Sequence, residues 1–203
     1  MNGLSKKGDY MNHRQQLLSI AVAALGLVAM ACTCSMPKLG GVGPAPKATV
    51  PVSKEAAASM QKKIDQAASQ AKSTGQFKVT VTESELTSYI DQQIKARRAQ
   101  GDEIPLASPQ VKLTQGQMWV YGTFLAGSSK VNGLVVVSLQ VQSGRLKIQI
   151  VRVDLGPLPV PKPFIQQINE QIQTLVDEQS SDITLTGIAI REGEMDVTGN
   201  GNQ

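Results

Sequence analysis

The amino-acid sequence predicts an α+β fold built on a mostly antiparallel sheet. Two stretches, residues 83–98 and 163–179, repeat apolar residues at helical spacing. Between them, residues 111–155 read almost entirely as strands joined by Gly-containing turns. The predicted order is helix, strand, helix, four strands, helix and two strands. Because strands and helices do not alternate regularly, this order favours antiparallel pairing over βαβ units.

The first 31 residues have the pattern of an export signal. Three basic residues precede an uncharged apolar run from Leu17 to Ala31. That run is about 15 residues long, which is short of the roughly 20 needed to span a bilayer. The following "AMAC" resembles a bacterial lipobox, which predicts lipidation of Cys32, although Ala29 stands where the usual motif has Leu. Ordinary signal cleavage, an uncleaved short anchor and a buried core helix remain as alternatives.

Cysteine and histidine usage excludes several kinds of chemistry. Removing residues 1–31 from the 203-residue chain leaves 172 residues, enough for one domain and a tether. Both cysteines, Cys32 and Cys34, precede the predicted domain, and the single histidine is His13. The domain therefore lacks the groups of a Ser-His-Asp triad, a Cys-His nucleophile or a common zinc site. We predict a non-enzymatic protein without a cofactor.

Charge and aromatic content argue against nucleic-acid binding. The formal net charge is only +4, and aromatic residues make up 3% of the chain. A nucleic-acid interface needs clustered Lys and Arg, usually with aromatic residues on which bases stack. The Lys and Arg residues of this chain are instead spread along its length.

The segment after the signal is predicted to be a tether followed by a helix. Residues 32–53 are rich in Pro, Gly and small side chains, which is typical of a linker. Ser53 is a good N-cap, three alanines follow, and Gly75 is a plausible stop. The resulting helix, residues 54–75, either packs on the domain or forms a stalk.

The main domain is predicted to extend over residues 76–199, before a disordered tail at 200–203. It opens with the alternating strand "QFKVTVTE". Thr82 and Glu85 then form a capping-box pattern at the start of the helix 83–98.

Turn signals divide the rest of this domain. Gln115-Gly116 and Ser143-Gly144 predict hairpin turns, and Asn132-Gly133 predicts a further turn or bulge. Pro163 suits the first turn of the helix 163–179, and a final hairpin turns at Glu192-Gly193.

Several strands are apolar on both faces. In "LVVVSLQV", Val135 and Val137 point one way while Leu134 and Val136 point the other. Because a sheet with one wet face alternates more cleanly, part of the second face must be covered. One explanation is an ordinary core. The other is a curved sheet wrapped around a long amphipathic helix, which leaves an apolar slot for an acyl chain. The candidate slot residues are Leu86, Tyr89, Ile90, Ile94, Trp119, Tyr121, Val135, Val137, Leu139, Phe164, Ile168, Ile172 and Leu175.

Three segments resemble the LmeA-like and YpmS-like extracytoplasmic proteins. They are "FKVTVTESELTSYI", the central hairpins up to "RLKIQIVRVDLGPLPVP", and the closing "DITLTGIAIREGEMDVTG". The resemblance covers about residues 76–199 and carries no catalytic signature. It implies a tubular, BPI-like half-fold that binds phospholipid or another amphiphile. Arg145, Lys147 and Arg152 are candidates for a basic entrance, but a solvated strand face is the simpler interpretation.

The leading functional prediction is a lipid-anchored protein on the outer side of a bacterial membrane. It would hold or transfer a phospholipid or similar lipid in the apolar slot and contact the membrane surface through its anchor. A secreted or periplasmic location is the alternative. A second hypothesis is an envelope lipoprotein with a filled core, acting as a scaffold or interaction module for a protein partner. The third, an enzyme acting on lipid or polysaccharide, is disfavoured by the missing His and Cys.

Overall fold

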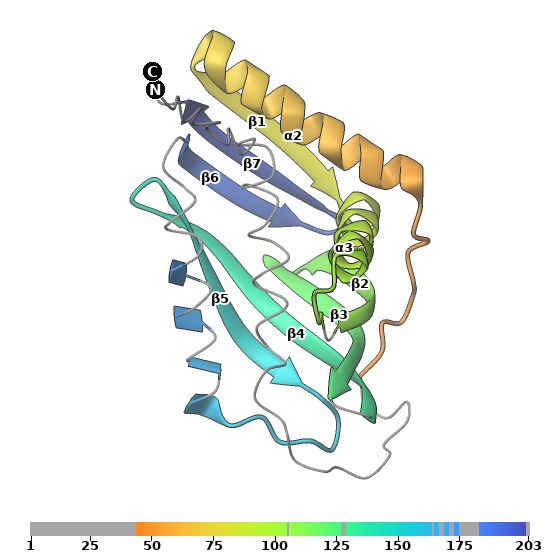
Figure 1. The fold of residues 1–203 in the computed structure, drawn as a ribbon. Helices are drawn as coiled ribbons and strands as arrows, with labels where there is room; N and C mark the ends of the chain where they lie inside the picture. Colours follow the sequence, from red (N-terminus) through yellow and green to blue (C-terminus); the bar gives the residue numbers. More distant parts are fainter. Residues whose placement is uncertain are drawn as a thin grey trace, which may run out of the picture.

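Figure 1 shows the fold in a computed structural model, which describes residues 44–104, 106–126, 129–163, 165–166, 169–170, 173–174 and 183–201. The predicted signal and Cys32 lie outside the described residues. The elements are α2 (Lys54–Thr74), β1 (Gln76–Thr82), α3 (Glu83–Ala99), β2 (Leu106–Thr114), β3 (Gln117–Ala126), β4 (Ser129–Gln142), β5 (Arg145–Asp154), β6 (Ile183–Arg191) and β7 (Glu194–Gly201). Every pairing between these strands is antiparallel, which confirms the predicted α+β class.

Both helices begin as the sequence predicts. The Ser53 hydroxyl accepts a hydrogen bond from the Ala56 amide at 3.0 Å, and Gly75 ends α2 in the left-handed conformation. At α3, Thr82 and Glu85 form the complete capping box. None of the helices in the described part of the chain is long and apolar enough to cross a bilayer.

The strands form two sheets whose apolar faces are turned toward a shared core. One sheet has the order β1-β7-β6 and the other β2-β3-β4-β5. Main-chain hydrogen bonds join the sheets at two places. The Leu185 amide donates to the Gly144 carbonyl at 2.8 Å, and the Gly193 amide donates to the Leu113 carbonyl at 2.9 Å. In Figure 1, β6 accordingly lies between β7 and the β4–β5 hairpin.

The two helices cover the sheets at one end of the molecule. Helix α2 packs on α3 and β1, and α3 packs on β2 (Figure 1). The apolar stripe of α3 is buried in the main core and consists of Leu86, Ile90 and Ile94. The helix predicted at residues 54–75 therefore lies against the folded body, because α2 contributes Met60 to the same core. Strand β7 ends at Gly201, two residues beyond the predicted domain boundary at 199.

The turn or bulge predicted at Asn132-Gly133 is wrong. Both residues lie inside the continuous strand β4, where Gly133 pairs with Gly122 and Asn132 with Thr123. The predicted hairpin turns at Gln115-Gly116 and Ser143-Gly144 do form, with positive φ at all four residues.

Close packing explains why glycine occupies position 133. A Cβ added there would lie 2.5 Å from Leu155 Cδ2 and 2.6 Å from Phe124 Cδ2. The glycine therefore makes room for an aromatic ring in the core, a requirement that leaves no turn-like signature in the local sequence.

We expect Gly133→Ala to lower the free energy of unfolding by about 1–3 kcal/mol, because the added methyl group overpacks the Phe124 and Leu155 side chains. Urea unfolding followed by circular dichroism measures this change. Gly187→Ala is the matched control, since only the Thr198 hydroxyl, at 3.0 Å, lies near its added Cβ. Equal losses in the two variants would contradict the packing explanation.

Candidate functional site

The inner face of the four-stranded sheet is an apolar wall. The strand registers place alternate residues of β2 to β5 on this face. Each of these residues pairs with an inward residue of the neighbouring strand, so the apolar surface is continuous across the sheet. Its members are Leu106, Val111, Leu113, Met118, Val120, Phe124, Val131, Val135, Val137, Leu139, Val141, Leu146, Ile148, Ile150, Val153 and Leu155. Such a surface suits the hydrocarbon part of a ligand.

Burial differs between members of this wall. Leu106, Val111 and Leu113, near α3, are 0% exposed. Three residues of the β4–β5 hairpin, Leu139, Leu146 and Ile148, are only half-buried although they pack against the same core. We call these three residues the hairpin wall.

The hairpin wall lies beyond β3 because β4, with 14 residues, is longer than β3, with 10. Strand β3 begins at Gln117, and its pairing with β4 reaches Met118 opposite Val137. Leu139 and the residues that follow therefore extend beyond β3. The half-buried, inward side chains of β6, Ile188 and Ile190, pack against the same core.

The free edge of β5 is covered by the segment 162–174, whose described residues are helical. The Asn169 side chain accepts from the Ile150 amide at 2.7 Å and donates to the Ile150 carbonyl at 3.2 Å. Gln173 accepts from the Ile148 amide at 3.4 Å and donates to the Leu146 carbonyl at 3.3 Å. Figure 1 shows this segment in blue beside β5, and Ile165 packs on the core. The hairpin wall thus lies between β6 and this segment.

The structure brings some of the predicted slot residues together. Leu86, Ile90 and Ile94 of α3 share the core with Val135 and Val137, and Leu139 packs against it.

Tyr89 is buried but does not belong to this cluster. Burial, with a smaller contribution from the charge of Asp65 on α2, raises the pKa of Tyr89 to about 12. The phenol is therefore neutral at physiological pH.

Two predicted slot residues lie on the other face of the sheet. Trp119 pairs with Val136 and Tyr121 with Leu134, whereas Val135 faces the core. The two rings form a tilted pair, with centroids 6.5 Å apart and an interplanar angle of 41°. The structure therefore does not place Trp119 and Tyr121 with the rest of the predicted set. Four further candidates lie outside the described residues: Phe164, Ile168, Ile172 and Leu175.

Comparison with known families connects this geometry to a ligand class. The sequence model of the LmeA-like phospholipid-binding family matches residues 53–200, which include every helix and nearly every strand residue named above. The chain belongs to the LmeA-like phospholipid-binding family. This confirms the resemblance seen in the sequence. A search of curated proteins finds no match. The family is one of lipid-binding proteins and not of enzymes.

The candidate basic residues of this LmeA-like protein do not line its apolar wall. Arg145, Lys147 and Arg152 are exposed, and their strand positions place them on the face of β5 opposite the hairpin wall. Arg152 forms an ion pair with Asp154 at 2.7 Å. The Arg152 hydrogen bond is the main reason why the pKa of Asp154 lies below its usual value. These observations agree with a solvated strand face.

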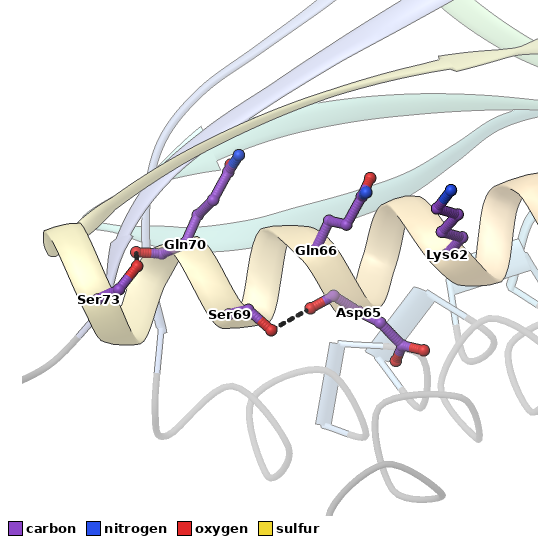
Figure 2. Close-up of a pocket in the computed structure, with 6 residues that line it drawn as sticks. All are labelled: Lys62, Asp65, Gln66, Ser69, Gln70 and Ser73. Atoms are coloured by element: carbon purple, nitrogen blue, oxygen red, sulfur yellow. Dashed lines mark hydrogen bonds between the residues drawn. The ribbon is translucent and has the colours of Figure 1, made fainter.

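A depression lies on the surface of α2, away from the hairpin wall. Figure 2 shows its lining residues, which are Lys62, Asp65, Gln66, Ser69, Gln70 and Ser73. The Ser69 hydroxyl donates to the Asp65 carbonyl at 2.8 Å within the helix. The described lining residues all carry polar groups. The part of the chain that the structure describes contains no group of three His, Cys, Asp or Glu residues that could hold a metal ion.

The sequence analysis missed Asn169 and Gln173. Two amide side chains spaced i, i+4, beside an edge strand, are the signal that was available. It becomes informative only once β5 is known to be the edge.

Proposed function

We propose that this protein binds a phospholipid with its acyl chains against the hairpin wall, in a slot between the two sheets and the segment 162–174. In this arrangement, the curved sheets and the helix predicted at 163–179 enclose the chains. Lipidation of Cys32 would hold the protein on the outer side of a bacterial membrane, where it stores or transfers lipid. The observation that carries the proposal is the half-buried hairpin wall, which continues an apolar core in a member of a phospholipid-binding family.

The energetics favour an apolar ligand at this place. Each methylene group removed from water contributes about 0.8 kcal/mol, so even a short stretch of acyl chain gains several kcal/mol on Leu139, Leu146 and Ile148. The wall provides no charged inward side chain among its members, so a head group would have to lie outside it, toward solvent.

The described part of the tether supports an anchored arrangement. The Val50 amide donates to the Gln110 side chain at 2.7 Å, and the Gln110 amide donates back to the Val50 carbonyl at 3.1 Å. From Val50 onward, the chain is therefore fixed to the domain. The 18 residue steps from Cys32 to Val50 (50 − 32) can extend to at most about 60 Å, which keeps the domain close to an anchoring membrane.

Lipid extraction tests the proposal. We expect the full chain, expressed in its native host, to release about one phospholipid per protein into organic solvent, measured by mass spectrometry. A Cys32→Ser variant is the control, because it lacks the proposed covalent anchor but retains the slot. It should release the same phospholipid while losing incorporation of a labelled fatty acid. A variant that releases no phospholipid would contradict the slot, and unchanged fatty-acid labelling would contradict the anchor.

The second candidate function is an envelope scaffold with a filled core. It is favoured by the tight packing near α3, where Leu106, Val111 and Leu113 have no exposed surface. A stable protein partner recovered with the full chain, together with the absence of bound lipid, would support this function over lipid binding.

A further inference from the structure

Side-chain amides, rather than a neighbouring strand, satisfy the edge of β5. The Asn169 amide pairs with both main-chain groups of Ile150, as a partner strand would. Gln173 bridges the next two edge residues, Ile148 and Leu146. An uncovered edge would offer these groups to another chain, so the segment 162–174 protects the edge as well as flanking the hairpin wall.

The spacing of the two amides fits the strand they cover. Residues i and i+4 of an α-helix are about 6 Å apart along its axis, while every second residue of a strand is about 6.8 Å apart. Two amides on one helix face can therefore reach successive edge positions. The small difference between the helix spacing and the strand spacing agrees with the longer hydrogen bonds of Gln173. These measure 3.4 and 3.3 Å, compared with 2.7 and 3.2 Å for Asn169.

The two sides of the hairpin wall are attached differently. On the β6 side, a main-chain hydrogen bond of 2.8 Å joins Leu185 to Gly144, and the Thr184 side chain packs close against Gly144. On the β5 side, the contacts between described residues include the side-chain hydrogen bonds of Asn169 and Gln173. Such bonds can be exchanged for bonds to water without disrupting a strand pairing. Separating these side-chain bonds would therefore uncover the edge of β5 without breaking a strand pairing.

We propose that Asn169 and Gln173 are positioning residues that hold the segment 162–174 against β5 and thereby set the rate of lipid exchange. This inference rests on the proposed function. It adds where the lipid enters and which contacts separate to admit it. Each hydrogen bond typically changes an equilibrium by a factor of about 2–12, so losing the four bonds should accelerate exchange roughly tenfold or more.

The test compares the full chain with its Asn169→Ala/Gln173→Ala double variant. Both proteins are loaded with a phospholipid that carries a pyrene-labelled acyl chain. They are then mixed with unlabelled vesicles of phosphatidylethanolamine and phosphatidylglycerol. We expect the rate of label loss to rise about tenfold or more in the double variant, with a similar amount of lipid bound at saturation. Gln166→Ala, an exposed glutamine of the same segment, should leave the rate unchanged.

Hydrogen exchange provides a readout that general destabilisation would not reproduce. The Ile148 and Ile150 amides should lose protection in the double variant, while the Val137 amide, within β4, should keep it. Exchange rates of lipid within twofold of the parent, or unchanged protection of Ile148 and Ile150, would overturn this inference alone. A parent protein that takes up no labelled phospholipid would overturn the proposed function and this inference together.

Discussion

Glu85→Ala is expected to lower the free energy of unfolding by about 2–4 kcal/mol at neutral pH. Glu85 is 6% exposed and lies where α2 crosses the start of α3. Its carboxylate accepts hydrogen bonds from Ser59 at 2.6 Å, from Lys63 at 2.8 Å, and from the Thr82 amide at 3.0 Å. Alanine removes the ion pair and half of the capping box together. This loss of stability is smaller than for a fully buried ion pair, because the Lys63 side chain is 33% exposed and its ammonium group can be solvated by water once Glu85 is removed.

The same residue makes stability sensitive to acid. Burial by itself raises the pKa of Glu85. Hydrogen bonds from Lys63, Ser59 and the Thr82 backbone outweigh this effect, so the pKa in the folded protein lies below its ordinary value of 4.5. A carboxylate with a lowered pKa stabilises the fold above its ordinary pKa and loses that contribution as pH falls through the lowered value. The loss should therefore begin near pH 4.5 and increase below it.

Urea unfolding at pH 7 and pH 3 measures both effects. Glu85→Gln is the matched control, because glutamine can keep the capping box but not the charge. We expect it to fall between the parent and Glu85→Ala at pH 7, with a smaller loss on acidification. Some acid sensitivity should persist, since hydrogen bonding from Thr80 also lowers the pKa of Asp196. A Glu85→Ala variant whose free energy of unfolding lies within about 0.5 kcal/mol of the parent value would show that the packing of α2 on α3 does not depend on the Glu85 carboxylate.

The environment of Glu85 illustrates what could be predicted from sequence. Its pairing with Thr82 is local, so the spacing of three residues was sufficient to predict the capping box. Its bonds to Ser59 and Lys63 come from residues 26 and 22 positions earlier in the chain. They depend on how α2 crosses α3, which no local pattern in either helix reports.

The sheets show the same division between local and distant information. Alternation correctly assigned Val135 and Leu134 to opposite faces, and glycine turns located the hairpins. The sequence could not show that Gly133 lies in a strand and leaves space for the Phe124 ring, because that contact depends on core packing.

The candidate site depends on distant information more heavily. Trp119 and Tyr121 were grouped with the slot because they are apolar, yet register places them on the face opposite Val135. The extension of the β4–β5 hairpin beyond β3 follows from the unequal lengths of β3 and β4, and the contacts of Asn169 depend on β5 being an edge. Both are properties of the assembled sheet.

Ile148→Trp is expected to reduce phospholipid capture about tenfold or more while leaving the free energy of unfolding within about 1 kcal/mol of the parent. Ile148 is half-buried on the hairpin wall and packs against the core. If the proposed slot is present there, an indole can occupy space that an acyl chain would otherwise fill. The larger apolar side chain then competes with the ligand instead of straining the core.

The adjacent residue supplies a matched control. Gln149 is exposed and points to the opposite face of β5, so Gln149→Trp adds the same side chain outside the slot. Capture of a pyrene-labelled phospholipid from vesicles, measured beside urea unfolding, should separate the two variants. A filled core would reverse the pattern, because overpacking at Ile148 would then cost about 1–3 kcal/mol of stability without changing lipid capture. The pair of measurements therefore decides between a lipid slot and a scaffold core at one position of one strand.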